Sequence, residues 1–152
     1  MRQHIKGKMF KNINYYDNIW QYSKYYADMI AMAVRLKENE ESYASLLVLF
    51  NTTEMLFKSI REDDSTNLKD DIQWMYDKDY ITDEEYEFFN SENGMRILRN
   101  KMTHKDFYQY FVEIDGILYP FTEKETWDTM CELILPTTIQ IINNIISKHL
   151  VK

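Results

Sequence analysis

Glycine and proline are so scarce in this chain that they restrict the folds it can adopt. Its 152 residues include three glycines and two prolines. Sandwiches and barrels need many turns, and turns draw heavily on these two residues. Hydrophobic residues make up 45% of the chain, which is enough to build a core and argues against disorder. We therefore expect an all-α protein, and at this length a single helical domain over residues 1–152.

Apolar residues recur at three- and four-residue steps in the first half of the chain. From Tyr15 to Leu36 this spacing predicts one long amphipathic helix, which the polar run 37–42 ends. A second helix is predicted from Ser42 to about Arg61. Its expected buried face consists of Leu46, Leu47, Phe50, Leu56, Phe57 and Ile60. Two helices of this length predict an antiparallel bundle of four or five helices.

Shorter helical patterns follow in the second half. One carries Leu68, Ile72 and Met75 on one side. Thr82 with Glu85 three residues later is a capping box, which predicts a helix start. Gly94 either interrupts that helix or is tolerated within it, and helical spacing resumes with Met95, Leu98 and Met102.

A hairpin and a final helix complete the expected fold. Asp115-Gly116 lies between two runs of β-forming residues, so we expect a short β-hairpin at 108–119. Thr122 and Glu125 form a second capping-box pattern, and the apolar spacing that follows it predicts a last helix. Pro136 is expected to kink or divide that helix.

The segment 98–104 carries the side chains best suited to chemistry. On an ideal helix its polar groups fall within an arc of roughly 140°, opposite Met95, Leu98 and Met102. The polar arc consists of Arg96, Arg99, Asn100, Thr103 and His104. A helix end near Thr103 would let the chain turn and bring the guanidinium of Arg99 near the imidazole of His104.

Such a set suits phosphodiester cleavage without a metal. Histidine titrates near neutral pH and can move a proton to or from an RNA oxygen, while arginine holds the phosphate. RNA supplies its own nucleophile, the 2′-hydroxyl. The spacing alone arises by chance in roughly one such protein in three or four. The simpler interpretation is an exposed Arg and His on a solvated helix face.

The run Leu98-Arg99-Asn100-Lys101-Met102-Thr103-His104 resembles the signature of the HEPN superfamily, in which Arg, usually followed by Asn, precedes His by four to six residues. That signature lies near the end of the third main helix of a small antiparallel bundle. Here two predicted long helices precede it and one follows. The segment Ser45 to Phe57, which includes Glu54, also resembles the second helix of the family.

The resemblance implies a metal-independent endoribonuclease of toxin–antitoxin or phage-defence systems, with no cofactor. It would act as a homodimer that pairs two Arg–His sets in a composite site. His104 would be the acid/base, Arg99 the phosphate clamp and Asn100 the orienting amide. Further RNA contacts would come from Arg96, Lys101 and Lys105.

One position departs from part of the family. Toxins of the family whose antitoxin is a nucleotidyltransferase often have Tyr two residues after His, where this chain has Asp106. The nearest downstream tyrosine is Tyr108. The departure weakens the prediction of such an antitoxin partner more than it weakens the prediction of a nuclease.

Two other functions stay open. The first is a non-catalytic helical module that binds a partner or a nucleotide. The second is an acidic protein that mimics nucleic acid, since the net charge is −7.

Other polar clusters predict less. His4, His149 and Cys131 have no metal-ligand spacing. Acid clusters such as Asp63-Asp64 and Asp83-Glu84-Glu85 can be paired carboxylates, or caps and solvated faces. The aromatics Tyr15, Tyr16, Tyr22, Tyr25 and Tyr26 can stack on bases, or form core and dimer interface.

Charge and cysteine content bear on partners and location. Arg2, Lys6, Lys8 and Lys11 make residues 1–13 a basic arm, either a flexible solvated terminus or a phosphate-contacting segment. The single cysteine cannot form an internal disulfide, which fits a reducing compartment. The longest apolar run, near 46–50, is far too short for a membrane span. We expect a cytoplasmic protein with no membrane partner.

Overall fold

The structure, a computed structural model, is predominantly helical and describes residues 13–151. Apart from Ile13, the predicted basic arm at residues 1–13 lies outside the described residues. The helices are α2 (Ile13–Tyr22), α3 (Lys24–Glu38), α4 (Ser42–Arg61), α5 (Leu68–Asp77), α6 (Asp83–Asn90), α7 (Met95–Met102), the short 3₁₀ helix η1 (Phe107–Gln109) and α8 (Lys124–Leu150). The strands β1 (Phe111–Ile114) and β2 (Ile117–Pro120) form the hairpin. The prediction of an all-α fold with a short hairpin is confirmed.

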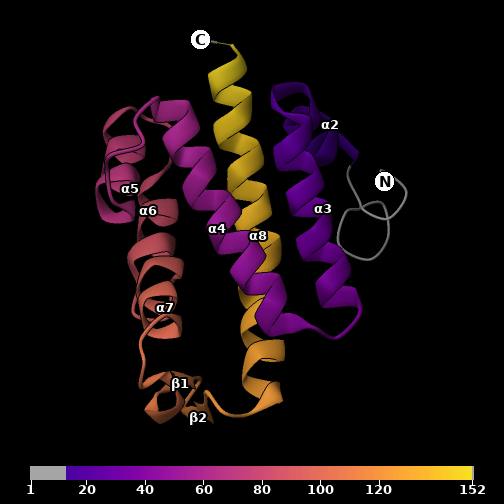
Figure 1. The fold of residues 1–152 in the computed structure, drawn as a ribbon. Helices are drawn as coiled ribbons and strands as arrows, with labels where there is room; N and C mark the ends of the chain where they lie inside the picture. The colour runs from indigo at the N-terminus through magenta and orange to yellow at the C-terminus, as the bar shows by residue number, and fades with distance from the viewer. Residues whose placement is uncertain (1–12, 152) are drawn as a thin grey trace.

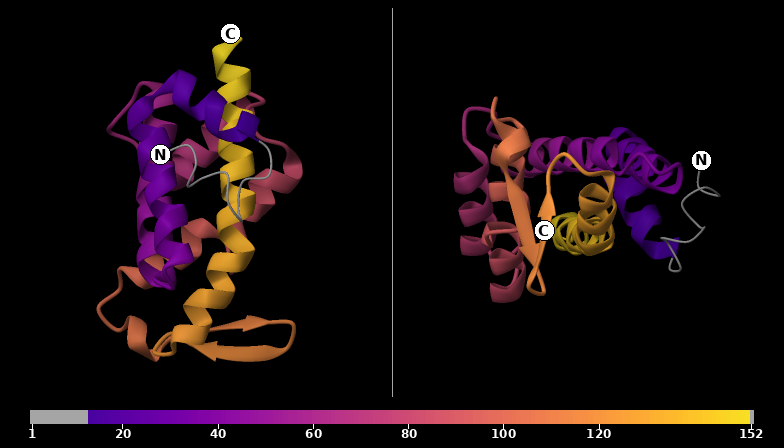
Figure 2. Two further views of the ribbon diagram at one scale, coloured as in Figure 1. Left: turned by 90° about the vertical axis from the view of Figure 1, so that its right-hand side faces the viewer. Right: turned by 90° about the horizontal axis from the view of Figure 1, so that it is seen from below.

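The helices form upright columns around one core. In Figure 1, α3 descends, α4 ascends beside it, α5 to α7 descend as a third column, and α8 returns in the direction of α4. The hairpin lies across the lower end of the bundle, as both views in Figure 2 show. No helix in residues 13–151 is both long and apolar enough to cross a membrane.

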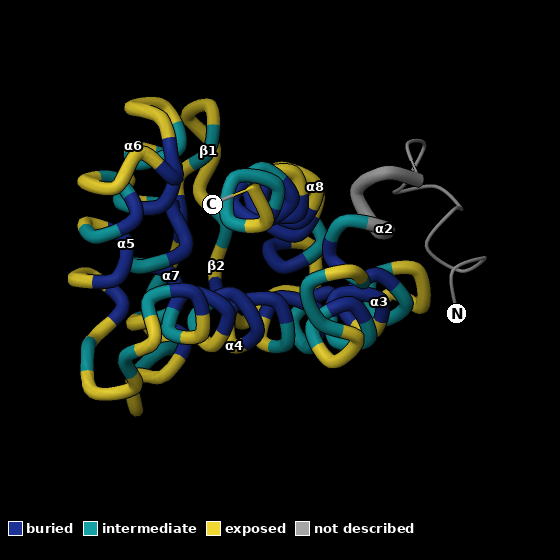
Figure 3. Tube along the Cα trace, turned by 90° about the horizontal axis from the view of Figure 1, so that it is seen from above, coloured by how far each residue is buried: buried dark blue, intermediate teal, exposed yellow. Residues whose placement is uncertain are grey.

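Aromatic and aliphatic side chains from every column fill the core. Figure 3 shows that the buried sides of α3, α4 and α8 face one another. The rings of Phe57 on α4 and Phe89 on α6 meet edge to face, with centroids 5.5 Å apart. On α8, the fully buried Ile142, Ile145 and Ile146 pack into the same cluster. Burial of this apolar surface is the main stabilising contribution to the bundle.

The first predicted helix is two helices, and the prediction of a single one is wrong. The break lies at Ser23, whose backbone is extended and whose side chain accepts a hydrogen bond from the N–H of Tyr26 at 3.3 Å. Serine at this position satisfies one of the free N–H groups at the start of α3. Only Ser23 separates α2 from α3, so there is no loop whose composition would have indicated the break.

Two predicted helix starts in the middle of the chain are confirmed. Helix α4 begins at Ser42 and ends at Arg61, as predicted, although Leu47 is 40% exposed and not part of its buried face. At α6 the capping box is complete: Thr82 accepts from the N–H of Glu85 at 3.2 Å, and Glu85 accepts from the N–H of Thr82 at 2.8 Å.

Gly94 separates α6 from α7 because no side chain fits there. It is buried, and it immediately precedes the first residue of α7. A Cβ atom at this position would overlap the carbonyl oxygen of Phe88 and lie 2.8 Å from the Oγ atom of Ser91. The close approach of two backbone segments thus requires glycine.

The predicted hairpin is present, although its first strand starts at Phe111 because residues 107–109 form the 3₁₀ helix η1. Val112 pairs with Tyr119 and Ile114 with Ile117 in antiparallel register. Asp115 and Gly116 both have positive φ angles, 52° and 81°. This is the backbone of a two-residue turn whose twist matches that of the strands.

Helix α8 differs from its prediction at its start. Its N-cap is Glu123, not Thr122, so the predicted second capping box is absent from this helix. The first turn is fixed instead by the Thr126 hydroxyl, which donates to the Pro120 carbonyl, and by the Trp127 indole, which donates to the Phe121 carbonyl at 2.9 Å. Pro136 lies inside the helix without dividing it; its exposed position leaves the unpaired carbonyl of the preceding turn open to water.

Acidic residues occupy left-handed positions at three helix ends. Glu40, Glu62 and Asp79 follow α3, α4 and α5 with φ angles of 63°, 61° and 62°. Glycine is the usual residue at such positions because it lacks a Cβ. These ends are therefore strained relative to glycine.

Gly94→Ala should destabilise the protein. The added methyl group meets backbone that cannot move without shifting α6, so we expect a loss of about 1–3 kcal/mol in the free energy of unfolding. Urea unfolding followed by circular dichroism measures it, and Glu92→Ala at an exposed neighbouring position is the control. Equal midpoints for the two variants would contradict the close-approach argument.

Candidate functional site

The predicted site segment occupies α7 and the turn after it. Met95, Leu98 and Met102 are buried and anchor the helix, as its spacing predicted. Arg96 and Arg99 are half-buried, and Asn100 is exposed. Helix α7 ends at Met102, one residue before the expected end at Thr103. The polar side of the helix therefore faces solvent and its neighbours α4 and α5.

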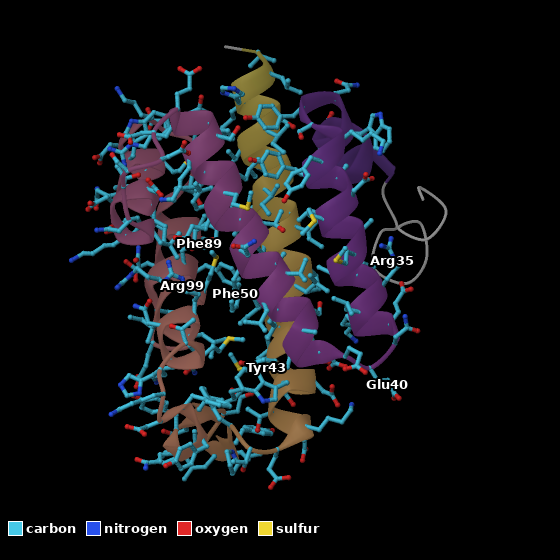
Figure 4. The ribbon with its side chains drawn as sticks, viewed as in Figure 1. Arg35, Glu40, Tyr43, Phe50, Phe89 and Arg99 are labelled. Carbon is cyan, nitrogen blue, oxygen red and sulfur yellow. The ribbon has the colours of Figure 1, made fainter. Side chains whose placement is uncertain are left out.

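Arg99 is fixed by an ion pair with α4. Its Nη2 atom donates to Oε1 and Oε2 of Glu54 at 2.8 and 2.9 Å. Its Nη1 atom donates to the side-chain oxygen of Asn100 at 3.3 Å, while its Nε atom is buried without a partner. Figure 4 shows Arg99 on the α7 column, beside α4. The guanidinium is thus oriented before any ligand binds, and Glu54 offsets part of its charge.

A cleft of about 260 Å³ opens beside this guanidinium. We name it the cationic cleft, and it is lined by Asn67, Leu68, Lys69, Arg96, Arg99 and Asn100. None of these lining residues is acidic, in a chain whose net charge is −7. Asn67 is the N-cap of α5, whose first turn also carries Asp70 and Asp71, so the positive charge of the cleft comes from Lys69, Arg96 and Arg99. The arrangement is suited to an anion such as phosphate.

Arg96 is held in place from α6. Its Nε atom donates to the side-chain oxygen of Asn90 at 2.8 Å. Arginine presents several donors in a planar fork, so this bond orients the remaining donors without neutralising the charge. The cationic cleft thus contains two arginines whose orientation is set by neighbouring helices.

His104 lies in the exposed turn that follows α7. Its Nδ1 atom accepts a hydrogen bond from the backbone N–H of Asp106 at 3.1 Å. Its ring meets that of Tyr110 edge to face, with centroids 5.7 Å apart. A neutral imidazole whose Nδ1 atom accepts this bond carries its proton on Nε2.

The structure brings together some of the predicted site residues and separates others. Arg96, Arg99 and Asn100 line the cationic cleft, whereas His104 is not among its lining residues. Within residues 13–151, no hydrogen bond joins Arg99 to His104; each has the other partners described above. The expected approach of guanidinium and imidazole therefore does not occur as a direct contact.

The two lysines predicted to contact RNA, Lys101 and Lys105, lie near His104 and not at the cationic cleft. The ammonium of Lys101 lies 5.8 Å from the centroid of the Tyr110 ring, a cation–π contact. Lys105 is exposed. Neither lysine lines the cationic cleft.

Three contributors to the site were not predicted as site residues. Asn67 and Lys69 lie at the start of α5, and Glu54 lies on α4. Asn67 before an apolar helical pattern is a readable cap signal, and its side chain accepts from the N–H of Asp70 at 2.8 Å. That this helix end lies beside α7 depends on tertiary packing, which spacing within the sequence does not reveal.

The acid clusters are caps and structural pairs. Asp63 accepts from the side chain and the N–H of Ser65, and these bonds lower the pKa of its carboxyl group. Asp83 accepts from the hydroxyl of Tyr76 at 2.6 Å, which raises the pKa of that tyrosine. Asp63, Asp83 and the capping residue Glu85 thus serve local structure, while Asp64 and Glu84 are exposed, as the interpretation of caps and solvated faces predicted.

Metal-ligand groups are not assembled in the described part of the chain. Among residues 13–151, no three His, Cys, Asp or Glu side chains lie together in a way that could hold a metal ion. His149 bonds through Nδ1 to the hydroxyl of Tyr80 at 3.1 Å. Cys131 is fully buried and contacts the Oγ atom of Ser45 at 3.6 Å.

The described tyrosines of α2 and α3 pack on one another. Tyr22 and Tyr26 stack with centroids 6.1 Å apart, and the hydroxyl of Tyr22 bonds to Ser59 at 2.6 Å. Tyr25 is 51% exposed and meets Tyr26 edge to face. The side chains of Tyr15 and Tyr16 lie outside the described residues. Packing between helices accounts for Tyr22 and Tyr26, and leaves the exposed Tyr25 open to a partner.

No family model, curated protein or solved structure matches this chain. Its function is therefore inferred from its own residues and their geometry.

The Glu54–Arg99 pair should show energetic coupling. Both side chains are about one-quarter exposed, so we expect a coupling of about 1 kcal/mol in a double-mutant cycle of Glu54→Gln and Arg99→Gln. Chemical denaturation of the four proteins measures it. The more exposed pair Lys124–Asp128, mutated in the same way, should couple less. Strictly additive effects at Glu54 and Arg99 would show that the ion pair contributes nothing.

Cys131 should be unreactive in the folded protein. Burial raises the pKa of its thiol, so little thiolate is exposed to a reagent. Titration with 5,5′-dithiobis(2-nitrobenzoate) should detect no thiol in the native protein and one thiol per chain in guanidinium chloride. Rapid reaction of the native protein would contradict this burial.

Proposed function

We propose that this chain is a metal-independent endoribonuclease of HEPN type, acting in the cytoplasm in a toxin–antitoxin or phage-defence system. One observation carries the proposal: Arg99, oriented by Glu54, opens onto a cleft without acidic lining residues, and the exposed His104 follows shortly after the same helix. A fixed cation and an accessible imidazole are the two groups that this reaction needs.

The cationic cleft would hold an RNA phosphate. Lys69, Arg96 and Arg99 supply charge, and the amide of Asn100 supplies a donor. Because the whole chain is acidic, attraction of RNA has to come from this local concentration of positive charge rather than from net charge. Backbone contacts at Lys101 and Lys105 would extend it toward His104.

His104 would transfer protons at Nε2. A base takes the proton from the 2′-hydroxyl, the 2′-oxygen attacks phosphorus, and the leaving 5′-oxygen takes a proton from an acid. The products are a 2′,3′-cyclic phosphate and a 5′-hydroxyl. In the conformation shown, Nδ1 accepts from Asp106, so neutral His104 presents an N–H at Nε2. Acting as the base requires the other tautomer.

Separation of His104 from the cleft supports a homodimer. One chain places an imidazole outside its own cationic cleft. A second copy related by a two-fold axis would supply its His104, and would give the reaction both an acid and a base. The composite site thus needs two chains.

A second candidate function is a non-catalytic module that binds a nucleotide or a partner protein. One observation favours it: Nη2 of Arg99 already donates to both carboxylate oxygens of Glu54. A guanidinium in that state can complete a binding site without stabilising the charge that develops in a reaction.

Expression and RNA cleavage distinguish the two. The wild-type protein should slow bacterial growth and cleave RNA in EDTA, leaving cyclic phosphate ends. His104→Gln should lower the cleavage rate by about 10²–10⁴-fold, since it removes the proton-transfer group. His149→Gln, at the other described histidine, keeps a partner for Tyr80 and should cleave like the wild type.

Several outcomes would contradict the nuclease. Equal loss in the two histidine variants, or cleavage only with Mg²⁺, would exclude the proposed chemistry. RNA that binds without cleavage, with binding lost in Arg99→Gln, would support the non-catalytic module.

A further inference from the structure

A second, oppositely charged cavity lies at the lower end of the bundle. Its volume is about 500 Å³, it is open to solvent, and it is lined by the turn between α3 and α4, η1 and the start of α8. We name it the acidic aromatic pocket, and it is lined by Glu40, Glu41, Ser42, Tyr43, Phe107, Phe121, Thr122, Glu123, Lys124, Trp127 and Asp128. Figure 4 shows Glu40 and Tyr43 at this end of the molecule, apart from Arg99.

Aromatic rings form the inner wall of the pocket. Tyr43 and Trp127 meet edge to face with centroids 4.7 Å apart, and Phe121 lies 4.9 Å from Trp127 in the same manner. The indole N–H of Trp127 donates to the Phe121 carbonyl at 2.9 Å, which fixes the ring. A wall that is rigid before a ligand binds loses little entropy on binding.

Carboxylates form the rim. Asp128 is bound by the ammonium of Lys124 at 2.8 Å and by the hydroxyl of Ser42 at 2.6 Å, and both bonds lower the pKa of its carboxyl group. Glu40, Glu41 and Glu123 are exposed, and in the described part of the chain they form no ion pair. Four carboxylates thus face one ammonium around an aromatic cavity.

We propose that the acidic aromatic pocket binds an arginine side chain presented by a basic peptide segment of a protein partner. A guanidinium is attracted to aromatic rings by their quadrupole and can be held by carboxylates in a planar fork. The carboxylates of the rim would repel the phosphates of RNA, and a purely apolar ligand would form no favourable interaction with them. This site does not depend on the proposed nuclease.

Arginine is favoured over a small inorganic cation for two reasons. An inorganic cation needs several converging oxygen ligands, and no such cluster exists in residues 13–151. The half-buried rings of Tyr43 and Phe107 instead offer a surface for the three-carbon stem of arginine beneath its charged head. The volume also leaves room for residues that flank the arginine.

A pair of peptides tests the proposal on the intact wild-type protein. Fluorescein-labelled tetra-arginine amide and its tetra-citrulline counterpart have nearly the same shape, but citrulline is uncharged. Anisotropy titration should show the arginine peptide binding about tenfold more tightly than the citrulline peptide, since the cation–π and carboxylate interactions need the charge. Equal affinities, or no binding of either peptide, would overturn the proposal.

Matched variants locate the binding. Glu40→Gln, Glu41→Gln and Glu123→Gln combined should weaken binding of the arginine peptide by about tenfold. A control that neutralises three exposed acids elsewhere, Glu62→Gln, Glu84→Gln and Glu87→Gln, has the same net charge and should bind like the wild type. Equal weakening in both triple variants would show attraction by net charge alone and would overturn the site.

Discussion

A single buried carboxylate fixes the position of α5 against α4. Asp71 on α5 has no exposed surface, and it accepts from Lys58 at 2.7 Å and from Arg61 at 3.1 Å, both on α4. The hydroxyl of Thr66 donates to it as well. Leaving such a charge without its partners costs about 3–5 kcal/mol. The α4–α5 contact is therefore specific. It also sets the position of the start of α5, which forms one wall of the cationic cleft.

Helix α4 organises both sides of that cleft. Near its end it supplies Lys58 and Arg61 to the carboxylate of α5, and one turn earlier it supplies Glu54 to Arg99 on α7. Charges of opposite sign on one helix thus hold two different neighbours. At the other end of α4, Tyr43 belongs to the acidic aromatic pocket. The cationic cleft and the acidic pocket are kept apart by the length of this helix.

Local signals in the sequence predicted local structure well. The capping box at Thr82, the turn at Asp115-Gly116 and the bounds of α4 all act within a few residues, and each is present in the structure. Ser23 is also a local cap, but an unbroken apolar stripe on both sides of it obscured the break. The faces of α7 were predicted, whereas its partner Glu54 lies 45 residues earlier, and only the folded bundle brings the two together. Spacing could not show that His104 would not line the cleft that Arg99 lines, because that depends on the turn after α7.

The helix ends at Glu40, Glu62 and Asp79 have a consequence for thermal tolerance. Each holds a left-handed backbone that glycine would adopt at roughly 1 kcal/mol lower cost, and the three follow different helices. The stabilising effects of glycine at the three positions should therefore add. The fold can thus be made more stable without any change to its core. Glu40 differs from the other two residues because its carboxylate also lies on the rim of the acidic aromatic pocket. Glycine at Glu62 or Asp79 would raise thermal stability without changing the acidic aromatic pocket. Glycine at Glu40 would also remove a carboxylate from the surface that a partner would use.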